Sequence, residues 1–157
     1  MSRHGALLCS VVALVLAACT GQTRYHRFLP LPAQGWGRQD TLLFQLPDSM
    51  VGDGLQMHVE LRAMRSFPYT DLWLALEQCD STHRLLHTDT IHFLMTDSEG
   101  ALSGRGQDFI EYASNALALA SDSVSRCTAV RIRHLMSSET VTGLADVGVK
   151  VTLSLIH

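Results

Sequence analysis

Apolar and polar residues alternate with a period of two over much of the chain. This alternation is typical of β-strands, because successive side chains of a strand point to opposite faces of its sheet. At residues 55–62, four apolar residues alternate with Gln, His, Glu and Arg, and at 147–155 five apolar residues alternate with Gly, Lys, Thr and Ser. We expect the odd-numbered residues of the second segment to face the core.

Further apolar runs bring the expected strands to at least six, at residues 42–46, 72–76, 91–95 and 130–132. The run at 72–76 is almost continuously apolar, which predicts a central strand buried on both faces. Turn-forming sequences such as Pro47-Asp48 and Gly52-Asp53-Gly54 separate the runs. Strands that follow one another without helices predict a single antiparallel β-sandwich, of the jelly-roll or immunoglobulin-like kind.

Two segments depart from this pattern. Residues 109–120 are rich in alanine and fit a helix of about three turns that Asp108 could cap, although they also fit extended structure. On propensity, we expect one short helix there. Residues 19–35 contain Pro30, Pro32 and Gly35 and are interpreted as a tether, which leaves 36–157 for the sandwich domain.

The first residues are typical of an export signal. Arg3 precedes an apolar stretch over 6–18, which is too short to cross a bilayer as a helix. The sequence Leu16-Ala17-Ala18-Cys19 resembles a bacterial lipobox, in which the peptide is cut before the cysteine and the cysteine is acylated. We therefore expect residues 1–18 to be a lipoprotein signal peptide and Cys19 to carry the lipid. The alternative is a plain secretory peptide followed by a chance cysteine.

Composition excludes some classes of protein and leaves the state of two thiols open. The formal net charge is −3, which argues against binding to nucleic acid. Cys79 and Cys127 would be the remaining thiols after acylation of Cys19. An envelope compartment permits a disulfide between them, and the alternative is two buried thiols that pack as small apolar groups.

Sequence patterns that would indicate catalysis or metal binding are weak. His83 and His87 would lie about 13 Å apart on a strand, too far to share one ion, and His92 adds no known ligand spacing. The glycines at 100, 104 and 106 lack the Gly-Lys-Ser/Thr of a phosphate loop. We therefore expect no enzyme, no cofactor, no metal and no small-molecule substrate.

Four aromatic residues could form either a binding platform or part of the core. They are Trp36, Phe67, Tyr69 and Trp73. Buried aromatics are common in sandwich cores, so we expect core positions. If they were exposed, the chain would fit a membrane-tethered binding module for glycan or peptide.

Several segments together resemble the gliding motility lipoprotein GldH family of Bacteroidetes. They occur in order between Tyr25 and Leu153, behind the lipobox: 35–44, 61–62, 67–74, 89–106, 133–136 and 143–151. Two departures are an alanine-rich stretch between Gln107 and Cys127, and Asp71 where the family more often has Asn.

The resemblance implies a non-catalytic envelope lipoprotein. It would support gliding motility or type IX protein secretion together with other envelope lipoproteins. The family implies no catalytic residues. Residues 20–23 carry no acid, which favours the outer membrane, with the domain facing the periplasm.

The first prediction concerns the anchor. Replacing Cys19→Ala should abolish incorporation of labelled palmitate and release the protein from the membrane fraction, because the thiol is the acceptor of the first acyl chain. Undiminished labelling of the variant would contradict acylation at Cys19.

Overall fold

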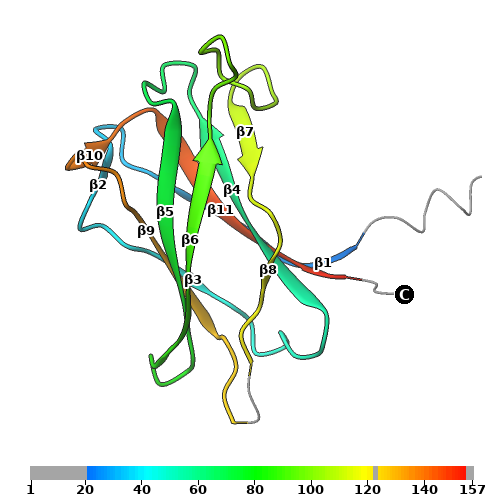
Figure 1. Cartoon of the computed structure of the whole chain (residues 1–157). Coiled ribbons are helices and arrows are strands. Elements are labelled where there is room, and N and C mark those ends of the chain that lie inside the picture. Colours follow the sequence, from blue (N-terminus) through cyan, green and yellow to red (C-terminus); the bar gives the residue numbers. More distant parts are fainter. Residues whose placement is uncertain (1–20, 122–123, 155–157) are drawn as a thin grey trace, which may run out of the picture.

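The computed structural model describes residues 21–121 and 124–154, and all regular elements in these ranges are β-strands (Figure 1). One sheet has the order β1-β11-β4-β7, with β8 also paired to β4. The other has the order β3-β9-β5-β6, and a short ribbon joins β10 to β2. The strands are β1 (Gln22–Pro30), β2 (Trp36–Gly37), β3 (Leu42–Gln45), β4 (Leu55–Ala63), β5 (Asp71–Cys79), β6 (Leu85–Leu94), β7 (Ile110–Ala113), β8 (Leu117–Ala118), β9 (Ala129–His134), β10 (Thr140–Val141) and β11 (Leu144–Leu153).

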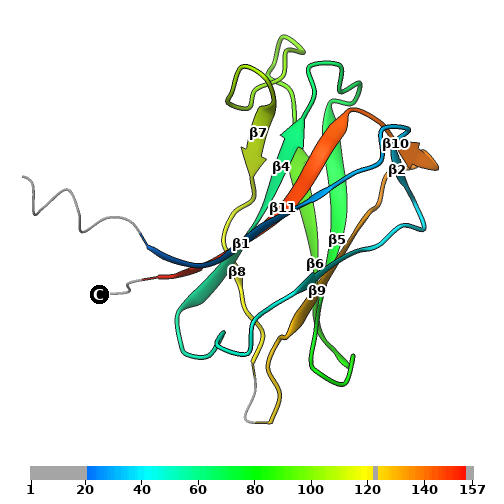
Figure 2. The same cartoon turned by 180° about the vertical axis from the view of Figure 1, so that it is seen from behind.

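The two larger sheets pack face to face, and their pairings are antiparallel (Figures 1 and 2). Their inward side chains form one apolar cluster that includes residues of both sheets. The expected antiparallel β-sandwich is therefore confirmed. No helix in the described ranges is long and apolar enough to cross a membrane.

The register of β11 and β4 explains the alternation seen in the sequence. Val147, Val149 and Val151 of β11 pair with Leu61, Val59 and Met57 of β4, and all six side chains are fully buried. The expected inward direction of the odd residues of β11 is thus confirmed up to 151. Residue 153 is half-buried, and 155 lies outside the described residues.

The second sheet has β5 in its interior, between β9 and β6, as its apolar sequence predicted. Leu72, Leu74 and Leu76 point inward and are fully buried, and Ala75 on the outer face is also buried. Trp73 on the same outer face is 40% exposed. Burial on both faces is therefore wrong at Trp73.

The short helix expected over residues 109–120 is wrong. Ile110–Ala113 form β7 and Leu117–Ala118 form β8, and both pair with β4. The hydroxyl of Tyr112 donates a hydrogen bond to the Met95 carbonyl at 2.7 Å, which ties this segment to the end of β6. Pairing and burial outweigh the weak helix propensity of the alanines here.

The tether expected over 19–35 is wrong for residues 22–30, because they form β1. This strand pairs with β11 from Gln22↔Leu153 to Pro30↔Asp146. Tyr25 and Leu29 pack against the core, while most other side chains of β1 are exposed. The sandwich therefore begins at residue 22 rather than at 36.

The second prediction tests the register of β11. Val149→Asp should lower the free energy of unfolding by about 3–5 kcal/mol, because it buries an unpaired charge in the centre of the core. The adjacent Lys150→Asp, at a half-buried position on the other face, should cost about 0.5 kcal/mol. Urea unfolding of both variants measures the difference, and equal losses would contradict the register.

Candidate interaction surfaces

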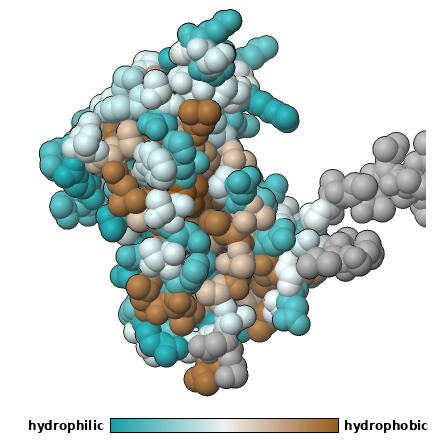
Figure 3. All heavy atoms as spheres, viewed as in Figure 1, coloured by the Kyte–Doolittle hydropathy of each residue, from teal (hydrophilic) through white to brown (hydrophobic). Residues whose placement is uncertain are grey.

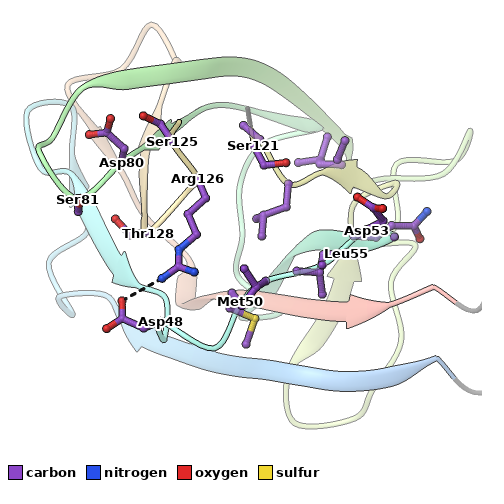
Figure 4. A pocket seen from close by; sticks show the side chains of 18 of the residues that line it. Asp48, Met50, Asp53, Leu55, Asp80, Ser81, Ser121, Ser125, Arg126 and Thr128 are labelled. Carbon is purple, nitrogen blue, oxygen red and sulfur yellow. Dashed lines mark ion pairs between the residues drawn. The ribbon is translucent and has the colours of Figure 1, made fainter. Parts of the chain in front are cut away.

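A hollow of about 1510 Å³ opens at one end of the sandwich (Figure 4). It lies between three connections, those from β3 to β4, from β5 to β6 and from β8 to β9. Residues 116–121, which include β8, form part of its wall. Because three loops and a short strand line it, the hollow depends on contacts that hold these segments in place.

Gln78 provides one of these contacts. Its side chain is fully buried at the inner face of β5. The side-chain nitrogen donates to the Ala118 carbonyl at 3.0 Å, and the side-chain oxygen accepts from the Ala120 amide at 2.7 Å. Since β8 pairs with β4, the Gln78 amide links the second sheet to the first across the end of the core. Nothing in the sequence pattern singled out this residue.

Asp80 orders the turn between β5 and β6. Its carboxylate accepts hydrogen bonds from the hydroxyl of Thr82 at 2.7 Å and from the amides of Thr82 and Arg84 at 2.9 and 3.0 Å. The Thr82 hydroxyl is the largest cause that lowers the pKa of Asp80 to about 2, helped by these amides and by the Arg84 guanidinium. This carboxylate therefore serves as a structural acceptor and is a poor general base.

An ion pair joins two of the loops. The Arg126 guanidinium lies 3.6 Å from the Asp48 carboxylate, as the dashed line in Figure 4 marks. Both side chains face the hollow, and Asp48 is otherwise almost fully exposed. This ion pair, Gln78 and Asp80 therefore hold in place the segments that surround the hollow.

The histidines singled out in the sequence do not converge. His83 lies in the turn after β5 with a φ of 63°. His87 contacts Asp89 at 3.1 Å, and His92 contacts Asp71 at 3.2 Å. In the part of the chain that the structure describes, no group of three or more His, Cys, Asp or Glu side chains could hold a metal ion.

Cys79 and Cys127 are both buried thiols near the ends of neighbouring strands. The amide of Thr128 donates to the Cys79 carbonyl at 2.9 Å, so the two segments run side by side. Burial raises the pKa of the Cys127 thiol to about 11. A disulfide between them and two separate buried thiols stay the alternatives that the sequence leaves open.

The aromatic residues divide between core and surface. Trp36 and Phe67 are buried and Tyr69 packs against the core, as expected. Trp73 instead lies on the outer face of the second sheet and stacks on His92, with ring centroids 4.0 Å apart and an interplanar angle of 9°. The core interpretation is therefore wrong for Trp73 alone among the four.

Exposed apolar residues surround Trp73. Leu94 is 66% exposed and Leu135 is 40% exposed, and the Leu135 amide donates to the Trp73 carbonyl at 2.8 Å. Arg133 pairs in the ladder with Ala75 and is exposed. We call these residues the Trp73 face: Trp73, His92, Leu94, Arg133 and Leu135. Figure 3, which shows the molecule from the side of β5 and β6, displays apolar residues interspersed with polar ones.

Comparison with known proteins gives one family match. The model of the family described as GldH lipoprotein matches residues 23–151, from β1 into β11. No curated protein matches the chain. Among solved structures, the crystal structure of the infectious bursal disease virus VP2 subviral particle matches 83% of this chain at 11% identity and a TM-score of 0.35. The match spans 33% of the viral chain.

The third prediction concerns a buried histidine at the other end of the core. His134 is fully buried, and its ring meets that of Trp36 edge to face at 5.4 Å. Burial is the main cause that lowers the pKa of His134 below its ordinary value. The His134 imidazole therefore binds a proton more readily in the unfolded chain than in the folded one. The contribution of neutral His134 to the free energy of unfolding is fully present above about pH 6.5 and falls as the pH drops below it.

Urea unfolding between pH 5 and 8 checks this expectation. The variant His134→Phe should lose part of the decline in stability at acid pH. The control His83→Asn changes an exposed histidine in a turn. Asn tolerates the positive φ at this position, so the variant should fold, and it should keep the decline because His134 is unchanged. A decline that is unchanged in His134→Phe would contradict the assignment.

Proposed function

Because the chain belongs to the GldH lipoprotein family, whose model covers residues 23–151, we propose that it assembles with other envelope lipoproteins and stabilises them. In this role it supports gliding motility or type IX protein secretion without catalysing a reaction. Its place is the outer membrane, with the sandwich in the periplasm and the lipid on Cys19. Family membership is the observation that carries the proposal.

The Trp73 face supports a role in protein contacts. Tryptophan and arginine are enriched among the residues that contribute most to protein–protein binding, and here both lie beside exposed leucines. At the hollow, the carboxylates of Asp80 and Asp48 and the guanidinium of Arg126 are engaged in hydrogen bonds or an ion pair within the chain. A lipid anchor also raises the effective concentration of the domain toward partners held in the same membrane.

The fourth prediction tests assembly through this face. In a deletion strain, other envelope lipoproteins should fall in abundance and secretion should decrease. The double variant Trp73→Asp with Leu94→Asp should reproduce this loss, and partner lipoproteins should no longer co-purify with it from detergent-solubilised membranes. Two charges in a desolvated contact should weaken binding by at least tenfold.

Leu43→Asp is the matched control. Leu43 is 47% exposed on β3, the opposite edge strand of the same sheet. The Leu43→Asp variant should co-purify with partner lipoproteins and support secretion as well as the unchanged chain does. Recovery of the unchanged protein alone, with secretion intact on deletion and a bound saccharide or peptide, would instead support a tethered binding module.

A further inference from the structure

The start of the sandwich lies very close to the expected lipid. Gln22 is the first residue of β1 and pairs with Leu153, the last residue of β11. Cys19 precedes Gln22 by three residues, which span at most about 11 Å of extended chain. If Cys19 carries the acyl chains, the bilayer surface must lie within that short distance of the start of β1.

This constraint gives the two ends of the sandwich different positions relative to the membrane. β1 has nine residues and extends for about 30 Å from Gln22 to Pro30, so its other end lies away from the lipid. Leu153 also pairs with Leu55, the first residue of β4, and the Ser154 amide donates to the Gly54 carbonyl at 2.8 Å. The loop before β4 therefore lies at the membrane-proximal end.

The same end exposes two aliphatic side chains on neighbouring loops. Val51, three residues before Gly54, is 65% exposed, and Val124 in the β8–β9 connection is 89% exposed. The ion pair between Asp48 and Arg126 joins these two loops, and both valines line the mouth of the hollow. Gly52, next to Val51, has a φ of 123°, and a Cβ added there would meet nothing within 4 Å, so it lies at a projecting turn.

We propose that Val51 and Val124 contact the bilayer that holds the anchor and enter its interfacial layer. This inference rests on the proposed acylation of Cys19. The described acidic and basic side chains on the two loops include Asp48, Asp53 and Arg126, with no excess of positive charge. The contact is therefore apolar rather than electrostatic, so anionic lipid should not strengthen it and salt should not weaken it.

The orientation also places the Trp73 face toward the periplasm. β5 runs from Asp71 to Cys79 beside β6, and Leu94 is the last residue of β6, at the end of the second sheet away from the hollow. Leu94 is 66% exposed, nearly the same as Val51. It is thus a matched control for a membrane contact.

The experiment uses the acylated full chain added to vesicles of phosphatidylethanolamine and phosphatidylcholine. An environment-sensitive fluorophore is attached singly at Val51→Cys, Val124→Cys or Leu94→Cys, and lipids with a spin label near the headgroup act as quenchers. The fluorophores at 51 and 124 should lose most of their emission, in low and high salt alike, and that at 94 should keep its emission. The unchanged chain measures stray labelling at Cys79 and Cys127, which are buried.

Two results with the acylated chain would overturn the proposal. Absence of quenching at 51 and 124 in an acylated chain would show that the loops do not reach the lipid, and equal quenching at 94 would show that the orientation is not fixed. Mass spectrometry of each preparation separates these results from a failure of the anchor. A chain without acyl groups on Cys19 would overturn both the anchor and this contact.

Discussion

The antiparallel pairing of β11 with both β1 and β4 supports the rest of the structure. β4 and β11 face the second sheet with side chains that are fully buried, each of which contributes about 1.5–3 kcal/mol from removal of apolar surface from water. β1 is an edge strand whose sheet partner is β11. Through β11, the first residues of the domain are therefore joined to the core, and the beginning and end of the fold meet at one end of the sandwich.

The strands that face the core on one side could be predicted from the sequence, because burial on one face forces a period of two. Residues 55–62 and 147–153 show this most clearly, and the central position of β5 followed from its nearly continuous apolar run. β1 gave no such signal. It lies at a sheet edge, and Tyr25, Leu29 and the other partly buried positions are too few to mark a strand.

The interaction surfaces were harder to predict because they depend on contacts between distant residues. The amide of Gln78 bonds a segment forty residues later, and a polar residue in an apolar strand does not indicate its partner in advance. The alanine-rich sequence of residues 109–120 has a local propensity for helix, but pairing with β4 makes β7 and β8 strands. The same holds for Trp73, which the apolar run placed in the core but which stacks on His92 of the neighbouring strand at the outer face of the sheet.

The direction of β1 has a mechanical consequence. If Cys19 carries the lipid and a partner binds at the far end of the sandwich, a load between them acts nearly parallel to this strand. The hydrogen bonds between antiparallel strands are perpendicular to the strand axis. Such a load shears the β1–β11 ladder, so its bonds from Gln22 to Pro30 share the force instead of opening one after another. A strand that begins directly after such an anchor is thus oriented to transmit tension.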